Sequence, residues 1–342
     1  MAVTIKQTTF DDFEYLRHIV QDGQSEVVPL SSGRMSGTLS HIKFDDSFGV
    51  SSGDFSRGVR LRGVTSPTRW TLGMVLSTGG NATAQSEAVL PGTMLVIAPG
   101  EERYTSYQSK AAFSVTLVTP ETLNEFLSAN PAALELPLWK QSVSVVQTPD
   151  PALSMRQAAE MNILTNELTA AAKEGLSDQA AGFFKRSILD LFTRNIVKGF
   201  PIRELRPRPA ARLVCAVDRY LIDAGDRPVH ISELCGHFNV HRRKLHRAFM
   251  EVYGVPPITF ARNKRLGDVH TALLAGDERT AIRMVAREHG FLHLGRFAAE
   301  YRKLFGEMPS TTLKRAIRMF EMMTWIILSC EAIPGIMCQV SC

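Results

Sequence analysis

Two segments of the chain, residues 231–252 and 279–302, share one pattern about fifty residues apart. In each, a short stretch with apolar residues at helical spacing ends at a residue that tolerates a left-handed backbone, Asn239 or Gly290. An apolar residue follows directly, and a second helical stretch comes after it. The repeat therefore predicts two helix-turn-helix units.

The first unit separates an apolar side from a basic side. Leu245 and Phe249, four residues apart, point inward from the second helix, and Val240 fills the angle between the helices. His241, which precedes that helix, is a weaker N-cap than serine. The inward positions of the first helix are Ile231, Leu234 and Cys235. The outward positions of the second helix are Arg242, Arg243, Lys244, His246 and Arg247.

The second unit repeats this plan with one irregularity. Thr280 is the expected N-cap of its first helix, and Phe291 takes the place of Val240. When the two turns are aligned, Leu245 corresponds to the polar Arg296, and the next residue, His246, corresponds to Phe297. The inward-facing positions of the second unit are thus displaced by one residue, or its turn differs from that of the first unit. Its further inward positions are Ile282, Val285, Ala286 and Tyr301, and Arg302 and Lys303 lie outward.

The connecting stretch, residues 257–276, reads as one helix that ends at Gly276. A rigid helix would fix the separation of the two units, and recognition helices that enter one face of B-DNA lie roughly 34 Å apart. Residues 201–320 hold 22 basic and 12 acidic residues, a net charge of +10, whereas the rest of the chain has a net charge of −5. This asymmetry predicts one half that meets a polyanion and one half that does not.

Residues 212–316 resemble the AraC/XylS-type DNA-binding domain. The most specific stretches are LCGHFNVHRRKLHRAFMEVYGVPP (234–257) and GFLHLGRFAAEYRKLFGEMPSTTLKR (290–315). The resemblance covers about a third of the chain and implies a sequence-specific transcription regulator, an activator or repressor, rather than an enzyme. It implies double-stranded DNA, RNA polymerase, a small-molecule effector and a second copy of the chain as partners, with no cofactor.

By family position, Arg243, His246 and Arg247 of the first unit would face bases, because arginine bonds guanine bidentately and histidine reaches a base edge. Arg242 and Lys244 would bind phosphates, and His241 could do the same. A merely solvated basic face is the alternative for each of them.

In the second unit, Arg296 is the strongest polar reader of bases, so the first unit is expected to supply most of the specificity. Leu294 could touch thymine methyl groups. The other positions assigned to this unit's DNA-facing side are His293, Gly295, Ala298, Ala299, Arg302 and Lys303.

The N-terminal part has a different pattern. Residues 37–118 contain short alternating or apolar runs separated by Gly, Pro, Ser and Asn, which predicts a β-rich jelly-roll or cupin-like fold. Residues 120–198 predict helices that pack on it or form a dimer contact. The chain is therefore predicted to be α+β, with residues 1–198 as the effector-sensing or dimerisation domain. Residues 199–211, with three prolines, are the expected linker to the all-α domain.

The effector site is only weakly indicated. Trp70, Tyr104 and Tyr107, with Phe44 and Phe48, could line an apolar pocket, although aromatic residues on strands are more often core. Arg60, Arg62 and Arg69 could hold an acidic ligand or could be surface charges. A metal site is not expected, since His18 and His41 are the only histidines among residues 1–200.

Several further features restrict the class of protein. The N-terminus has no signal-peptide pattern and no apolar run is long enough for a membrane helix, so the expected location is the cytoplasm, at the nucleoid. Two other functions remain open: a DNA-repair regulator with a methyl-accepting cysteine, disfavoured because Cys215 and Cys235 lie on apolar helix faces, and a nucleoid binder without sequence preference. The apolar segment 317–342 either packs on the domain or on another subunit, or is an extension from a shifted stop.

Overall fold

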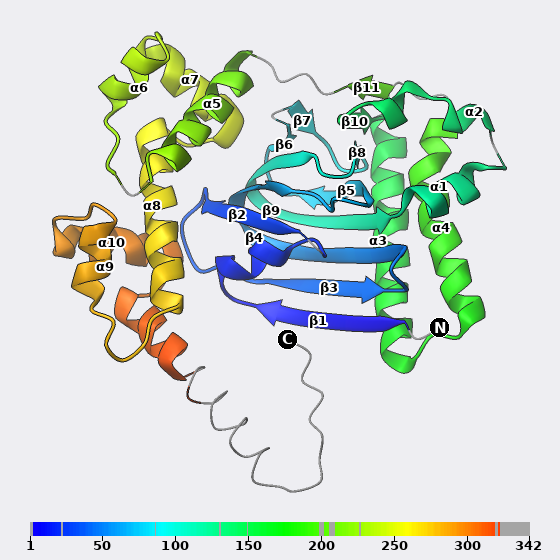
Figure 1. Cartoon of the computed structure of the whole chain (residues 1–342), viewed down its shortest axis with the longest axis horizontal. Coiled ribbons are helices and arrows are strands. Elements are labelled where there is room, and N and C mark those ends of the chain that lie inside the picture. Colours follow the sequence, from blue (N-terminus) through cyan, green and yellow to red (C-terminus); the bar gives the residue numbers. More distant parts are fainter. Residues whose placement is uncertain are drawn as a thin grey trace, which may run out of the picture.

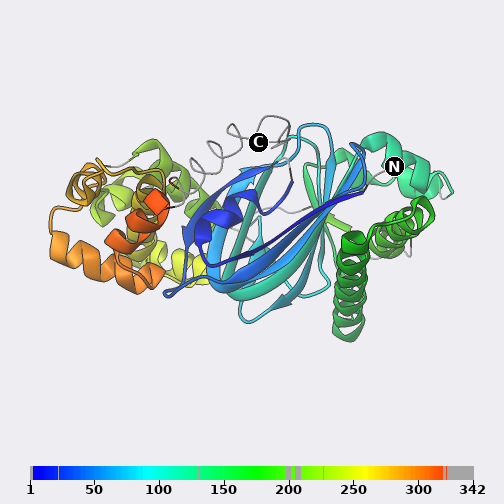
Figure 2. The same cartoon turned by 90° about the horizontal axis from the view of Figure 1, so that it is seen from below.

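The computed structural model describes residues 3–21, 23–85, 87–129, 131–148, 150–197, 202–204, 209–225, 227–318 and 321. A curved sheet lies at the centre, a pair of long helices covers one end of it, and a group of shorter helices packs on the other end (Figure 1). Figure 2 shows the same three parts from below, with the sheet curled between the two helical layers. The α+β architecture is the one predicted from the sequence.

The sheet has eleven strands among the described residues, and all of its pairings are antiparallel. The prediction of strands within residues 37–118 is confirmed, while the two strands before residue 30 were not anticipated. The strands are β1 (Thr4–Phe10), β2 (Gln24–Pro29), β3 (Gly37–Lys43), β4 (Phe48–Val64), β5 (Trp70–Thr78), β6 (Ala82–Ala84), β7 (Glu87–Val89), β8 (Met94–Ile97), β9 (Glu102–Val118), β10 (Val143–Val146) and β11 (Ile202–Glu204).

Two strands of 17 residues, β4 and β9, form the centre of the sheet and pair with each other along their length. The first half of β4 also pairs with β3 and its second half pairs with β2, so β4 changes partner near Gly58. A Cβ at Gly58 would lie 2.6 Å from the carbonyl oxygen of Gln108 on β9, so a side chain there would force the two backbones apart.

The predicted helices of residues 120–198 cover the outer face of the sheet. They are α1 (Pro120–Leu127), α2 (Pro131–Leu134), α3 (Pro151–Glu174) and α4 (Asp178–Val197). Thr119 caps α1 by accepting a hydrogen bond from the amide of Thr122, and Ser177 accepts one from Ala180 at the start of α4. The buried side of α3 and α4 joins the outer residues of the sheet in one cluster, which includes Met161, Leu168, Phe184, Ile188 and Phe192.

The C-terminal domain is helical throughout its described residues. Its helices are α5 (Pro209–Asp223), α6 (Ile231–His237), α7 (Arg242–Tyr253), α8 (Pro257–Leu274), α9 (Ile282–Glu288) and α10 (Leu294–Phe305), and residues 309–318 are also helical. The predicted connecting helix between the two units is α8. Among the described residues, none of the helices has the length and apolar character needed to span a membrane.

The expected linker and tail are only partly described. Of residues 199–211, residues 202–204 form β11 against β10, and α5 begins at Pro209; the remainder of this stretch lies outside the described residues. Most of segment 317–342 also lies outside them, so its two interpretations remain open.

A buried ion pair joins the sheet to the first helix of the C-terminal domain. Arg60 of β4 is fully buried and donates to Asp218 of α5 at 2.6 Å and to Glu26 of β2 at 2.8 Å. The hydroxyl of Tyr104 on β9 also donates to Asp218, at 3.3 Å. Burial lowers the pKa of Arg60, but the charges of Asp218 and Glu26 outweigh this and raise it above the ordinary value. The guanidinium therefore stays charged and depends on its two carboxylates.

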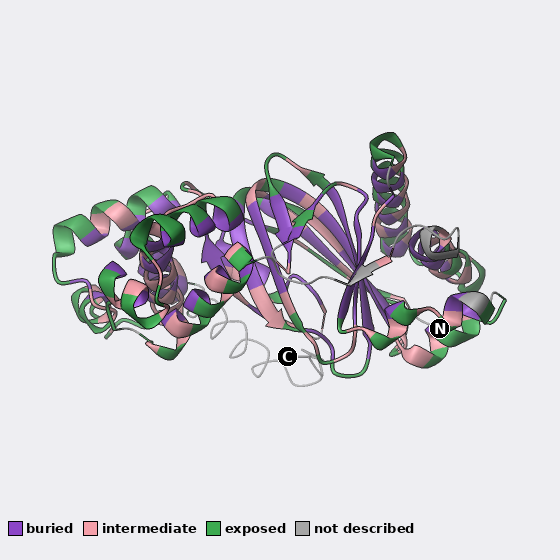
Figure 3. Cartoon of the chain, turned by 90° about the horizontal axis from the view of Figure 1, so that it is seen from above, coloured by how far each residue is buried: buried purple, intermediate pink, exposed green. Residues whose placement is uncertain are grey.

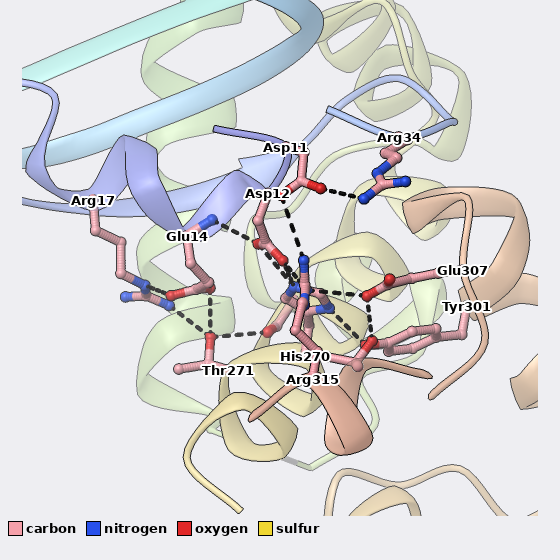
Figure 4. A network of polar contacts seen from close by, with 12 residues as sticks. Asp11, Asp12, Glu14, Arg17, Arg34, His270, Thr271, Tyr301, Glu307 and Arg315 are labelled. Atoms are coloured by element: carbon pink, nitrogen blue, oxygen red, sulfur yellow. Dashed lines mark hydrogen bonds and ion pairs between the residues drawn. The ribbon is translucent and has the colours of Figure 1, made fainter. Parts of the chain in front are cut away.

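A second polar network joins the N-terminal segment to the other half of the C-terminal domain (Figure 4). Asp12, just before the 3-10 helix η1 (Phe13–His18), lies 2.9 Å from Nε2 of His270 on α8 and also pairs with Arg315. The other ring nitrogen of His270 lies 2.6 Å from the hydroxyl of Tyr301 on α10. Burial raises the pKa of Asp12, but the hydrogen bond and charge of His270, together with Arg315, bring it down to about 2.

We predict that Asp218→Ala lowers the free energy of unfolding by about 3–5 kcal/mol, because it strands the buried charge of Arg60. Asp190→Ala, which removes an exposed partner of Arg194 on α4, should cost at most about 1 kcal/mol. Urea unfolding followed by circular dichroism measures both variants. Equal losses in the two variants would show that Arg60 does not depend on Asp218.

Candidate nucleic-acid interface

The first helix-turn-helix unit consists of α6 and α7, which are joined by residues 238–241. Asn239 has a φ of 48°, the left-handed conformation predicted for it from the sequence. Leu245 and Phe249 are fully buried, and Val240 packs against the same cluster. His241 is the N-cap of α7 and makes no side-chain capping bond, as expected from its residue type.

The second unit has the same geometry with one more residue in its turn. Helices α6 and α9 begin at Ile231 and Ile282, 51 positions apart, and Asn239 and Gly290 keep this offset. Helices α7 and α10 begin at Arg242 and Leu294, an offset of 52. The extra residue in the second turn is the reason why the inward register appeared to slip by one position in the sequence.

The prediction that Thr280 caps α9 is wrong. The N-cap of α9 is Ala281, which has no side chain able to accept a hydrogen bond. The hydroxyl of Thr280 instead bonds within the preceding turn, to the amide and the carboxylate of Asp277. The carboxylate of Asp277 thus stabilises the loop before α9, a role that the capping pattern in the sequence did not reveal.

The outward side of α7 is a row of exposed basic residues. Leu245, Ala248 and Phe249 hold the opposite side in the core of the domain, so that the basic side chains face away from the protein. Figure 3 shows much of the outer surface of the C-terminal helices exposed, in contrast to the mostly buried strands. The exposed residues predicted for this helix are all brought together on it: His241, Arg242, Arg243, Lys244, His246 and Arg247.

The outward side of α10 is exposed but less basic at its N-terminal end. Phe297 and Tyr301 hold its inner side, and Leu292 in the extra-long turn is 77% exposed. Arg296 is exposed but bonds to Glu300, one turn along the same helix, at 3.1 Å. The exposed residues predicted for this helix are His293, Leu294, Gly295, Arg296, Ala299, Arg302 and Lys303, and Ala298 is half-buried.

Glu300 and Arg262 were not anticipated as members of this surface. Glu300 accepts a hydrogen bond from Arg262 of α8 at 2.8 Å as well as the bond from Arg296. A hollow of about 290 Å³ between α8 and α10 is lined by these three residues and by Arg265, which lies over the ring of Phe291. An ion pair between α8 and α10 forms only in three dimensions, so the sequence pattern carried no signal for it.

A group of potential metal ligands lies at the domain contact, formed by Asp12, His270 and Glu307, whose ligand atoms are within 4.8 Å of one another. Arg315 lies between the two carboxylates and pairs with both of them. A guanidinium therefore already balances these charges, and the hydroxyl of Tyr301 completes the network with His270. The arrangement is that of a structural ion-pair network between domains.

The predicted aromatic and basic residues of the effector site are not brought together. Trp70 packs against Trp139 under the outer helices, and Tyr104 faces α5. Of the five aromatic candidates, only Tyr107 lines the interior of the sheet, and Phe44 and Phe48 lie in the cluster beneath α3 and α4. Of the predicted arginines, Arg60 pairs with Asp218 and Arg62 with Glu102 on the outer side of β4, and Arg69 also has a partner.

The two units with their exposed outer helices define a double helix-turn-helix DNA-binding domain. Residues 234–315 match a family described as helix-turn-helix domain. The chain is 39% identical over 90 residues to XylDLEGF operon transcriptional activator 2 of Pseudomonas putida, a match that covers 25% of this chain and 56% of that protein. The chain thus spans about half the length of this relative.

Two solved structures are similar to parts of the chain. A structure described as a probable AraC family transcriptional regulator from Rhodopseudomonas palustris is 36% identical, with a TM-score of 0.30, over 31% of this chain and 98% of that one. The AraC-like transcriptional activator CuxR matches over 78% of this chain and 94% of its own, at 14% identity and a TM-score of 0.38. By sequence, the C-terminal domain of the chain is of the AraC/XylS type.

We predict that Gly290→Ala destabilises the second unit by about 1–2 kcal/mol, because Gly290 has a φ of 78° and an added Cβ would lie 2.7 Å from Pro228. Asn239→Gly at the equivalent turn should change stability by only a few tenths of a kcal/mol, since glycine adopts the same conformation freely. Thermal unfolding compares the two variants. A loss in Asn239→Gly as large as that in Gly290→Ala would contradict this account of the turns.

Proposed function

We propose that this protein is a sequence-specific transcription regulator that inserts α7 and α10 into neighbouring major-groove turns of duplex DNA. The observation that carries the proposal is the row of exposed basic side chains along α7, within an intact helix-turn-helix unit whose inner side is packed. A basic surface that only meets solvent would not need to be held by a packed helix-turn-helix unit. Acting on chromosomal DNA, the protein would be found at the nucleoid.

The two helices have different shares in recognition. Arg243, His246 and Arg247 of α7 read base edges, and Arg242 and Lys244 bind the flanking phosphates. His241, at the start of α7, is also placed for a phosphate contact. Three different donors to bases on one helix give α7 the larger part of the specificity.

Helix α10 adds affinity and orientation. Arg296 is its polar reader of bases, with Leu294 for thymine methyl groups. Glu300 holds Arg296 in the DNA-free protein, so DNA must compete for this guanidinium. The basic residues at the two ends of the helix, His293, Arg302 and Lys303, are placed for phosphates.

The β-rich domain is proposed to sense a small-molecule effector, and the signal reaches RNA polymerase through DNA binding. Helices α3 and α4 are proposed to bind a second copy of the chain. Their outer side has a groove of about 580 Å³ in which apolar Ile163 and Phe183 lie among Glu160, Arg186 and Arg194. A surface with both signs of charge around apolar residues can pair with itself about a two-fold axis.

We predict that Arg243→Ala and Arg247→Ala each weaken binding to the preferred operator by about 1–3 kcal/mol and relax the choice of base at one position. Selection from a random DNA library, followed by fluorescence anisotropy on the selected sites, measures both effects. Unchanged base preference in these variants, with loss of preference in Arg296→Ala, would reverse the assigned shares of α7 and α10.

Lys244→Ala is the matched control on the same helix. Loss of a phosphate contact should weaken binding to all sequences alike and reduce the slope of log affinity against log salt by about 1. A wild-type protein with a steep salt slope and equal affinity for all sequences would show a nucleoid binder without sequence preference instead.

We predict that Phe183→Ala weakens self-association at least about tenfold, because Phe183 is 56% exposed in the single chain and is the largest apolar side chain besides Phe126 that lines the groove. Sedimentation equilibrium measures the dissociation constant. Met155→Ala on α3, which is 67% exposed and outside the groove, serves as the control and should leave it unchanged. A chain that is monomeric at all concentrations would exclude this dimer.

A further inference from the structure

Three arginines meet around one carboxylate in the hollow between α8 and α10. Arg262 of α8 donates to Glu300 at 2.8 Å, and Arg296 of α10 donates to the same carboxylate at 3.1 Å. Arg265, about one turn further along α8, lines the hollow beside them. Glu300 is the only acidic residue among the described residues that line the hollow, so three positive charges and one negative charge leave a net charge of +2 there.

Arg265 is the least compensated of the three arginines. It is half-buried, and none of the ion pairs between described residues includes it. Its guanidinium lies over the ring of Phe291, 5.1 Å from the ring centroid. Burial lowers the pKa of Arg265, and so does the charge of Arg262. The charges of Glu300 and Asp268 act in the opposite direction but do not cancel this effect, so an anion would stabilise the guanidinium.

The hollow opens on the side of α10 that carries Arg296, whose side chain is 73% exposed. On α8, Ile258, Arg262 and Arg265 are spaced by four and three residues, so they share one face of that helix. The volume of about 290 Å³ lies near the lower end of the range for small-molecule sites, about 300–1,000 Å³, and leaves room for a phosphate group. The site is thus accessible, basic and of suitable size for a phosphate.

The position of α8 indicates which phosphate this is. Helix α8 connects two units whose recognition helices, in the proposed function, enter neighbouring turns of the major groove. The minor groove and the two phosphate backbones that border it lie between two such turns. Arg262 and Arg265 lie near the centre of α8, which runs from Pro257 to Leu274. A backbone that passes from the groove of α7 to the groove of α10 therefore meets α8.

We propose that the hollow binds a phosphate of the DNA backbone between the two major-groove turns, through Arg262 and Arg265. The connecting helix is then a DNA contact and not only a spacer. Guanidinium groups form charge-assisted hydrogen bonds with phosphate, often two in parallel. This inference rests on the proposed DNA binding of α7 and α10 and adds a contact between them.

Glu300 competes with this phosphate. In the free protein its carboxylate takes the hydrogen bonds of Arg262 and Arg296, and in the complex it lies in the same hollow as the phosphate. Every DNA sequence meets this repulsion between like charges, whereas only a sequence with the right base offsets it through a bond to Arg296. Glu300 therefore favours the preferred operator over unrelated DNA.

The test measures the affinity of the full chain for its preferred operator and for an unrelated duplex of equal length, over a series of salt concentrations. Arg265→Gln should weaken binding to both duplexes about three- to tenfold and reduce the slope of log affinity against log salt by about 1. Arg265→Lys keeps the charge and should restore the slope. Lys173→Gln, on α3 at the other end of the sheet (Figure 1), removes one charge and should leave affinity and slope unchanged.

Glu300→Gln keeps the size of the side chain and removes the competing charge. It should strengthen binding to the unrelated duplex at least about threefold and lower the ratio of the two affinities. An unchanged salt slope in folded Arg265→Gln would overturn the proposal. If Arg265→Gln fails to fold, Glu300→Gln still decides, because an unchanged affinity for the unrelated duplex in that variant would contradict the competition with a phosphate.

Failure of this inference is distinct from failure of the proposed function. If Arg243→Ala relaxes the choice of base while Arg265→Gln and Glu300→Gln bind both duplexes like the wild type, the function stands and the phosphate site on α8 falls. A wild-type protein that binds no duplex at all would remove both.

Discussion

The buried charge of Arg60 is the interaction on which the arrangement of the two domains depends. It lies on the outer side of β4 with no solvent contact, and the carboxylates that neutralise it come from β2 and from α5. A buried guanidinium tolerates few positions of its partners, because separation from either carboxylate leaves an uncompensated charge. The pair therefore specifies how α5, and with it the first helix-turn-helix unit, sits on the sheet.

The network around Asp12 does the same for the second unit. Asp12 meets His270 near the end of α8 and Arg315 beyond α10, whereas the Arg60 network meets α5 and, through Glu26 and Lys264, the first half of α8. The sheet thus contacts both units at independent points. Helix α8 alone would fix only the distance between the two units along its axis. The two polar contacts also restrict how each unit is rotated about that axis. A domain that must present two helices to one face of DNA gains from both constraints.

Local sequence patterns predicted the elements well and the contacts between them poorly. The apolar spacing of Leu245 and Phe249 and the left-handed Asn239 are short-range features, and both were visible in the sequence. The strands before residue 30 were missed because β1 and β2 mix polar and apolar residues on both faces, so neither shows the alternation expected of a strand. The apparent slip of the repeat was also visible, but only the structure assigned it to one extra residue in a turn.

The arginines show most clearly where sequence reasoning ends. Arg60, Arg62 and Arg103 all lie in β-rich stretches with similar neighbours, and only the first two were named from the sequence, as ligand contacts or surface charges. Their roles are set by which side of the sheet each one faces and by which carboxylate lies opposite, and both depend on strand register. A register shift of one residue would exchange Arg103 with Tyr104.

This alternation also places the small cavity inside the sheet beside the contacts that hold the DNA-binding domain. On β9, Arg103 faces the cavity and Tyr104 faces Asp218; on β2, Ser25 faces Arg103 and Glu26 faces Arg60. The inner side chains therefore lie on the same two strands whose outer side chains hold α5. The inner and outer contacts are therefore one residue apart on each of the two strands.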